Sequence, residues 1–396
     1  MSNQVSILSC SDYKQKKVDA TIRQLLEQIG GISSFVSEGQ SVLLKPNLLS
    51  ATSPEYAITT HPAVVEAVVK LVQEAGGNPI IADSPGSTAP YNKRGLRSIY
   101  ESTGMVDVAR RTGAALNWDT RVVEVSHPDG VFVKRLEVIK PVIDADVVIN
   151  IPKLKTHTFT TFTGAVKNLF GVIPGYNKAA YHAKFQDLGC FSEMLLDVLG
   201  FVKPVLSVMD GIIGIEGDGP GRHGKPKYVG ALIASRDSVM LDAVACRIVG
   251  IEFKSVSVLT SAIKRGWWNG EFDEIDLVGS SIEEVSVADF QKPSTFLEPK
   301  SYIKQKWLQP IASLLLKSAF TPRPIPRQDD CIACGDCIKA CPQGAISIVG
   351  KLAVVDNDKC IRCYCCHELC PEGAIDLKLS WLGRLVQKSA IAGRRT

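Results

Sequence analysis

Apolar runs and amphipathic helical stretches alternate along the first three quarters of the chain. Strand-like runs and helical patterns follow one another at residues 5–8, 18–29, 41–49, 61–77 and 78–86. Pro62 lies near the start of the second helical pattern and Gly76-Gly77 lies at its end, as is typical of helix boundaries. The strand-like runs are apolar at successive positions, without polar alternation. This pattern predicts a buried, mostly parallel sheet.

A second set of alternating elements follows the first. It contains strand-like runs and helical patterns at residues 144–157, 190–200, 205–212, 228–235 and 238–250. Between the two sets, residues 122–133 contain Asp129-Gly130, which predicts a hairpin insertion. The expected fold class is therefore α/β, with a mostly parallel doubly wound sheet domain over residues 1–292.

The composition is that of an ordinary globular protein. Of the 396 residues, 45% are hydrophobic and 22% are charged, and the formal net charge is +4. This balance gives no indication of nucleic-acid binding. The N-terminus lacks the basic start and apolar run of a secretory signal, and no run of about 18 or more apolar residues follows. We therefore expect a cytoplasmic protein.

Nine of the twelve cysteines lie between Cys331 and Cys370, where the spacing CxxCxxCxxxCP occurs twice. In a reducing cytoplasm such cysteines are rarely disulfides. Three thiolates of a CxxCxxC loop converge on one [4Fe-4S] cluster, and the cysteine before the proline ligates the other cluster. The spacing thus predicts two [4Fe-4S] clusters with exchanged fourth ligands. One cluster is expected on Cys331, Cys334, Cys337 and Cys370, and the other on Cys360, Cys363, Cys366 and Cys341.

The cysteine repeat resembles the bacterial two-cluster ferredoxin domain, over about residues 328–378. Each half continues into a short strand-like run, at residues 346–349 and 375–378, as expected of a small α+β domain with two similar halves. Zinc is the alternative, but zinc sites need no CxxCxxC triplet followed by Cys-Pro. Cys365 lies outside the pattern and is interpreted as a free thiol. A structural or oxygen-sensing role is less favoured, because two adjacent clusters provide an electron relay.

Charged and amide side chains follow four of the expected strands. Ligands of doubly wound folds bind at the strand ends, so these residues are the candidate site. The lysines and His157 can hold a carboxylate or phosphate, and the acidic residues can act as acid, base or metal ligand. The candidate catalytic residues are Lys153, Lys155, His157, Asp210 and Glu216. The candidate binding residues are Lys45, Asn47, Asp83, Ser84, Lys167 and Asn168.

The alternative for each of these residues is a turn former or a solvated charge. Glu216 lies in a glycine-rich stretch at residues 211–226, which is expected to be a loop. That stretch is not a nucleotide-binding motif, since no Gly-Lys-Ser or Gly-Lys-Thr closes it and no GxGxxG follows a strand.

Three segments of the first domain resemble the domain of unknown function 362 family. They are VLLKPNL, DVVINIPKLKTHTFTTFTGAVKNLFGVIPG and VMDGIIGIEGDGPG, and the resemblance spans most of residues 6–285. The family commonly carries a ferredoxin-like module, so the resemblance implies a redox context. It implies no established reaction and no catalytic residues.

Two segments flank the cysteine domain. Residues 293–327 are expected to form a helical and proline-rich linker, and residues 379–396 a basic tail. An amphipathic helix at 299–320 can rest on a membrane surface, although packing on its own domain is favoured. Pro322, Pro324 and Pro326 are expected to form a stiff spacer.

Two functions fit the sequence. The first is an electron carrier that exchanges single electrons with a redox partner protein. The second is a reductase in which an anionic small molecule or additional cofactor, unknown in identity, binds at the strand ends of the α/β domain. The clusters are common to both, so the larger domain has to distinguish them.

Overall fold

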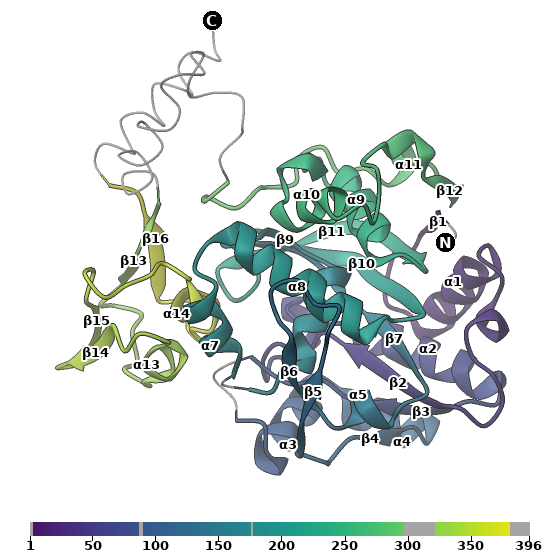
Figure 1. Cartoon of the computed structure of the whole chain (residues 1–396), viewed down its shortest axis with the longest axis horizontal. Helices are drawn as coiled ribbons and strands as arrows, with labels where there is room; N and C mark the ends of the chain where they lie inside the picture. The colour runs from purple at the N-terminus through teal and green to yellow at the C-terminus, as the bar shows by residue number, and fades with distance from the viewer. Residues whose placement is uncertain (1–2, 87–89, 176, 297–320, 381–396) are drawn as a thin grey trace, which may run out of the picture.

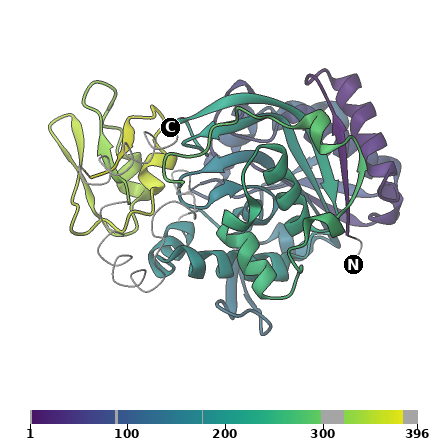
Figure 2. The same ribbon diagram turned by 90° about the horizontal axis from the view of Figure 1, so that it is seen from above.

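A computed structural model describes residues 3–86, 90–175, 177–296 and 321–380. The chain forms a large α/β part and a small C-terminal part, drawn in yellow-green, which lies against one end of the large part (Figures 1 and 2). The expected helix at 299–320 and the tail from residue 381 lie outside the described residues. No described helix has both the length and the apolar character needed to cross a membrane.

The large part is built on a ten-stranded sheet in which most neighbouring strands are parallel. Along its main path the strand order is β12 (Asp276–Gly279), β1 (Gln4–Ser9), β11 (Gly224–Ser235), β10 (Leu206–Gly217), β7 (Val147–Ile151), β2 (Ser41–Pro46), β3 (Asn78–Ile81) and β4 (Ala115–Leu116). The pairs β1–β11 and β10–β11 are antiparallel. The expected α/β class with a mostly parallel sheet is confirmed.

Helices cover both faces of this sheet (Figure 2). One face carries α1 (Gln15–Glu27), α2 (Pro62–Glu74), α3 (Lys93–Ser102) and α4 (Met105–Thr112), and the other carries α8 (Leu188–Val202), α9 (Ser238–Ile248) and α10 (Ser257–Lys264). In β2, Val42 and Leu44 belong to one apolar core and Leu43 to the other. A strand buried on both faces explains the unbroken apolar runs in the sequence.

A shorter pair of strands extends the sheet beside β10. A single residue separates the end of β7 from the start of strand β8 (Lys153–His157). Strand β8 pairs with β10 on one side and with β9 (Thr161–Thr163) on the other. Helices α6 (Ala165–Asn168) and α7 (Asn177–Lys184) follow. Lys153, Lys155 and His157 were expected just after the end of a strand. They instead lie on a separate strand, β8.

The glycine-rich stretch at 211–226 was expected to be a loop, and this expectation is wrong. Strand β10 continues through Gly217, and β11 begins at Gly224, so most of the stretch is a long β-hairpin. Only residues 218–223 form the turn. Glycine is needed in this strand because β10 passes close to its neighbours. A Cβ at Gly211 would lie 2.8 Å from Ala231 O.

The hairpin expected around Asp129-Gly130 is confirmed. It consists of β5 (Val122–Ser126) and β6 (Arg135–Ile139), an antiparallel pair, and α5 (Pro141–Asp144) follows it. Buried Asp197 of α8 accepts hydrogen bonds from the backbone N–H groups of residues 131, 132 and 133. These bonds fix the hairpin to the large part. Within residues 177–296, the last helix is α11 (Ile282–Val285).

Over residues 321–380, the small part contains two short β-ribbons and two short helices. Strand β13 (Arg323–Pro326) pairs with β16 (Ile375–Lys378), and β14 (Ile346–Val349) pairs with β15 (Leu352–Val355). The helices are α13 (Asp336–Ala340) and α14 (Cys365–Glu368). Pro322, Pro324 and Pro326, which were expected to form a spacer, thus lie next to or within the paired strand β13. This strand belongs to the small part, although it precedes residue 328, where the ferredoxin-type domain was expected to begin.

Candidate functional site

The eight cysteines of the repeat surround two cavities in the small part. One cavity is lined by Cys331, Cys334, Cys337 and Cys370. A second cavity is lined by Cys341, Cys360, Cys363 and Cys366. Each cavity therefore has three cysteines from one repeat and the fourth from the other. Within the described ranges, no three His, Cys, Asp or Glu side chains are close enough to bind a single metal ion.

The backbone of the two repeats explains why the cysteines converge. Three corresponding positions in each repeat have positive φ, namely Ala333, Gly335 and Gly344 in the first and Arg362, Tyr364 and Gly373 in the second. The first two of these positions in each repeat lie inside the CxxCxxC segment and curl it around its cavity, and the third follows the Cys-Pro step. The Ala345 N–H donates to Cys341 Sγ, and the Ala374 N–H donates to Cys370 Sγ, both at 3.2 Å. Hydrogen bonds of this kind to sulfur ligands influence the reduction potential of an iron–sulfur cluster.

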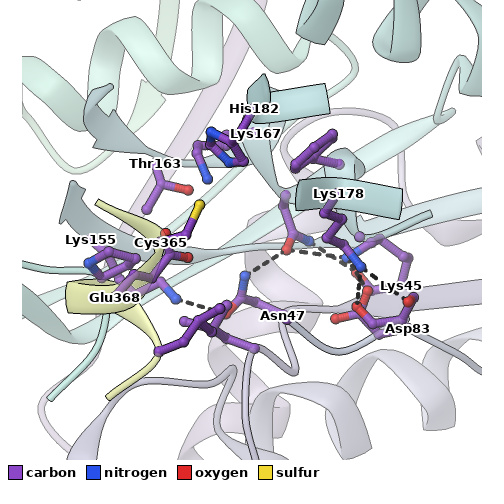
Figure 3. A pocket seen from close by; sticks show the side chains of 18 residues that line it. Lys45, Asn47, Asp83, Lys155, Thr163, Lys167, Lys178, His182, Cys365 and Glu368 are labelled. Carbon is purple, nitrogen blue, oxygen red and sulfur yellow. Dashed lines mark hydrogen bonds and ion pairs between the residues drawn. The ribbon is translucent and has the colours of Figure 1, made fainter. Parts of the chain in front are cut away.

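A separate pocket lies between the two parts of the molecule (Figure 3). Cys365, Glu368 and Leu369 of the small part form one wall. The other walls belong to the large part and include Lys45, Asn47, Asp83, Ser84, Lys155, Thr163, Lys167, Asn168, Lys178 and His182. The pocket is therefore closed by the helix that also carries Cys366, one of the repeat cysteines.

Buried hydrogen bonds hold the lower and right sides of the pocket as drawn in Figure 3. Lys45 Nζ lies 2.6 Å from Asp83 Oδ1, and the other carboxylate oxygen of Asp83 accepts from the Leu48 N–H at 2.7 Å. Asn47 Nδ2 donates to Asn168 Oδ1 at 2.9 Å. The strand ends of β2 and β3 are thereby joined to α6.

Burial changes the acid–base properties of the pocket. Removal from water lowers the pKa of Lys155 and that of Lys178 to about 7 in each case, because a charged amine is disfavoured there. The same cause lowers the pKa of Lys45, although the carboxylate of Asp83 opposes the shift. Burial lowers the pKa of His182 to about 3, so its imidazole is neutral.

The structure brings most of the expected site residues together. Seven of them line the pocket: Lys45, Asn47, Asp83, Ser84, Lys155, Lys167 and Asn168. His157 lies beside it, with Nε2 at 3.5 Å from Glu368 Oε2. Glu216 lies on β10, where its carboxylate accepts from the Gln291 N–H at 2.9 Å. It does not line the pocket.

Lys153 and Asp210 form a second, closed network away from the pocket. Lys153 Nζ donates to Asp210 Oδ2 at 2.7 Å and to Tyr13 Oη at 2.8 Å, and the Tyr13 hydroxyl donates to Asp210 Oδ1 at 2.8 Å. The His61 N–H also donates to Asp210, and the His61 ring stacks on Tyr13. Both carboxylate oxygens are therefore occupied by protein donors.

Sequence reasoning missed four polar or charged side chains of the pocket. Lys178 and His182 come from α7, and Thr163 and Glu368 come from β9 and α14. Lys178 and His182 are four positions apart, the spacing that places two side chains on one face of a helix. Nothing in the sequence of the repeat indicates that Glu368 faces the large part.

The turn of the β10–β11 hairpin holds the small part in place. The His223 and His367 rings stack with their centroids 3.8 Å apart, and His367 Nε2 lies 3.3 Å from Asp218 O. Gly221 lies directly against α14, since a Cβ at this position would be 2.2 Å from Glu368 O. The turn and α14 therefore have no room for a side chain between them.

Replacement of Gly221 by valine is expected to weaken this docking and expose Cys365. Overpacking at a close contact typically costs about 1–3 kcal/mol, so we expect the Cys365 thiol to be alkylated about tenfold faster. Mass spectrometry of the peptide that contains Cys365 measures this rate. Gly200→Ala is the matched control, because its Cβ would meet Trp267 at an ordinary 3.5 Å. An unchanged rate in Gly221→Val would contradict the docking role of the turn.

Comparisons with known proteins agree with this division of the chain. Residues 42–247 match the Domain of unknown function (DUF362), and residues 330–374 match the 4Fe-4S dicluster domain. The second match supports an iron–sulfur electron-transfer role. The chain is similar to Thylakoid-associated protein sll1697 of Synechocystis sp., with 36% identity over 302 residues, which are 75% of this chain and 90% of that protein.

A solved structure of the lactate racemase apoprotein from Thermoanaerobacterium thermosaccharolyticum shows a weaker similarity. It has a TM-score of 0.36 and 14% identity, and the match covers 59% of this chain. The chain spans about half of that structure, 54% of its length. On the sequence matches, the chain belongs to the domain of unknown function 362 family, and in it the family domain is followed by a 4Fe-4S dicluster domain.

Proposed function

We propose that the protein exchanges single electrons with a redox partner protein and with an anionic small molecule held in the pocket between its two parts. The observation that carries this proposal is the wall formed by α14, which presents Cys365 and Glu368 to the pocket while Cys366 faces a cysteine-lined cavity. A bound molecule would thus lie beside the redox module. The pocket favours the reductase hypothesis over a simple carrier.

Two complete ligand sets would hold two [4Fe-4S] clusters. Cys331, Cys334, Cys337 and Cys370 would hold one, and Cys360, Cys363, Cys366 and Cys341 the other, since each set lines one cavity. When bound, such clusters accept and donate single electrons. The zinc alternative is less well supported, because the two sets surround separate cavities rather than a point shared by four sulfurs.

The outer end of the small part is suited to a redox partner. Cys334 is exposed, and Ile332, in the same cavity wall, has 62% of its surface exposed. Ile338 is also exposed. Apolar side chains beside a solvent-accessible ligand set are a feature of transient protein contacts.

Anaerobic purification followed by iron and sulfide analysis tests the proposal. We expect about eight irons and eight sulfides per chain, with electron spin resonance signals that arise on reduction by dithionite. Two nearby reduced clusters should broaden each other's signals. Zinc in place of iron, or no reducible signal, would overturn the proposed function.

The cytoplasmic location expected from the sequence stays a prediction. The relative from Synechocystis is described as thylakoid-associated, which is compatible with peripheral membrane contact of a protein of this family. The segment at 299–320 that would make such a contact lies outside the described residues. Fractionation of cells, with a salt wash of the membranes, tests the location.

A further inference from the structure

The lysines of the pocket between the two parts differ in the number of N–H donors that are not bonded to protein and can bind a ligand. An ammonium group has three N–H donors. Lys45 Nζ has three protein partners, which are Pro46 O, Asn168 Oδ1 and Asp83 Oδ1. Lys178 Nζ also has three, namely Ser84 O, Ser84 Oγ and Pro85 O. Both side chains are therefore committed to holding the loops after β2 and β3.

Lys155 and Lys167 keep donors for a ligand. Lys155 Nζ donates to Asn47 Oδ1 and to Ile58 O, each at 2.8 Å, so one N–H is unused. Lys167 Nζ makes no hydrogen bond or ion pair with any residue that the structure describes, and its side chain is half-buried in the pocket wall. Lys167 thus lines the pocket with an ammonium group that has no acceptor among the described residues.

The free donors lie together on one wall. Lys155 on β8 is directly opposite Thr163 on β9, and Lys167 follows four residues after Thr163, on α6. Thr163 also lines the pocket, and in the described parts of the chain its hydroxyl has no hydrogen-bond partner. In Figure 3 Lys167 and Thr163 lie on the same side, next to His182.

His182 adds a buried nitrogen without a partner. Its Nδ1 is inaccessible to solvent and has no hydrogen-bond partner among the described residues. The ring stacks on Phe191 at 4.5 Å between centroids and meets the edges of Phe159 and Phe170. These aromatic contacts fix the ring, so Nδ1 cannot turn to find an acceptor or donor elsewhere. A buried polar atom without a partner is an exception in folded proteins, and the His182 side chain also lines the pocket.

The charges of the lining residues indicate the charge of that molecule. Four lysines and two carboxylates, Asp83 and Glu368, line the pocket, so the cationic groups outnumber the anionic ones by two when every lysine is protonated. Burial lowers the pKa of Lys155 and of Lys178 to about 7, and an anionic ligand would favour their charged form. Uncompensated buried charge is unfavourable, and a ligand with two negative charges would neutralise it. The free space inside the pocket is about 60 Å³, which is enough for several water molecules or one small ion.

We infer that this wall binds a small dianion, whose oxygens accept from Lys167, the remaining N–H of Lys155 and Thr163, and which also contacts His182. The inference rests on the proposed function only in taking the dianion to be part of the molecule that exchanges electrons. It assigns the ligand-binding role to Lys155 and Lys167 and a supporting role to Lys45 and Lys178. Phosphate-type groups and paired carboxylates share this chemistry.

Calorimetry on the anaerobically purified, oxidised full-length protein tests the inference with two probes. Sulfate represents a tetrahedral dianion, and succinate represents two separated carboxylates. We expect one saturable site for at least one of them at low salt, and no such site for chloride. The probe that binds more tightly identifies the class of the natural ligand. Absence of saturable binding by both dianions would overturn the inference.

Substitution of Lys167 decides whether the dianion occupies this wall. Lys167→Met should weaken binding about tenfold or more, because hydrogen bonds to charged groups are among the stronger ones. Lys264→Met is the control, since Lys264 is exposed at the end of α10. Thr163→Val, a nearly isosteric change, should weaken binding by a smaller factor. Equal affinity in Lys167→Met and Lys264→Met would contradict the assignment.

The same samples separate this inference from the proposed function. Iron content and the dithionite-reduced spectrum report on the redox module and do not depend on the dianion. Absence of both sulfate and succinate binding by the wild-type protein, with a normal reduced spectrum, would refute the dianion site alone. Dianion binding without iron or a reducible signal would refute the proposed function alone. Circular dichroism establishes that each variant is folded.

Discussion

Asparagine in place of Asp210 is expected to lower the free energy of unfolding by about 3–5 kcal/mol, the usual cost of removing one partner from a buried ion pair. Lys153 and Asp210 side chains are 1% and 0% exposed, so water cannot replace the missing carboxylate. The Tyr13 hydroxyl and the His61 N–H lose their charged acceptor as well. Denaturant unfolding followed by circular dichroism, under anaerobic conditions, measures the loss.

The pH dependence of this loss has a definite sign. Burial already lowers the pKa of Lys153, while Asp210 raises it, so removal of Asp210 lowers the pKa further. The unfolded lysine keeps its ordinary pKa and holds its proton to higher pH. At low pH, the buried charge of Lys153 therefore lowers the free energy of unfolding of the variant. As the pH rises and the amine of the folded protein becomes neutral, this destabilisation decreases. The difference between wild type and Asp210→Asn should shrink from pH 7 toward pH 10.

A surface ion pair provides the control for Asp210→Asn. Asp289 pairs with Lys227 at 2.6 Å, but its side chain is 78% exposed. Asp289→Asn should therefore have a much smaller effect, because solvent-exposed pairs contribute little. Equal losses in the two variants would mean that the Lys153–Asp210 network does not stabilise the fold in the way we describe. The expectation that these two residues are catalytic is a separate prediction, to be tested by activity once a substrate is known.

The sequence was sufficient to predict the architecture because the architecture depends on local patterns. Strands β2, β3 and β7 appear as short apolar runs, and each is buried on both sides by the helices that follow in the chain. The cysteine spacing likewise encodes the convergence of each CxxCxxC segment, since the ligands are a few residues apart. These features require no knowledge of contacts between distant segments.

The prediction of the site was less complete because the pocket depends on contacts between distant segments. Lys45 and Lys153 look alike in the sequence, as lysines at the end of an apolar run, but one lies in the pocket and the other in a separate ion-pair network. The difference arises because Lys153 lies on β8, which pairs with β10. The rule that ligands bind at strand ends does not predict this extra strand. Glu368 was not considered because the docking of α14 on the hairpin turn is a tertiary contact.

The glycine-rich hairpin shows a similar limit of sequence reasoning. Glycines at 211, 214 and 217 suggested a loop by composition, yet β10 and β11 pair along most of this stretch. Here glycine is needed for close approach rather than for a turn, as at Gly214, where a Cβ would meet Leu154 at about 3 Å. Composition alone does not separate these two uses of glycine.

Pairs of cysteine substitutions are expected to show that the two repeats exchange their fourth ligands. In the Cys331→Ala, Cys370→Ala double variant, both changes fall on the set that lines one cavity, so the set that lines the other cavity stays complete. One reducible [4Fe-4S] signal should remain, without the broadening caused by a second cluster, and about four irons should be retained. Cys190→Ala, outside both sets, should resemble the wild type.

The Cys360→Ala, Cys370→Ala double variant distinguishes the exchanged wiring from a local one. With exchanged ligands each set loses one cysteine, so no complete set of four remains and no intact [4Fe-4S] signal is expected. If instead each repeat bound its own cluster, this variant would keep one intact cluster and the Cys331→Ala, Cys370→Ala variant would have both sites damaged. The two wirings thus predict opposite results for the same pair of proteins. The grouping of Cys370 with Cys331, Cys334 and Cys337 around one cavity is the structural reason to expect the first.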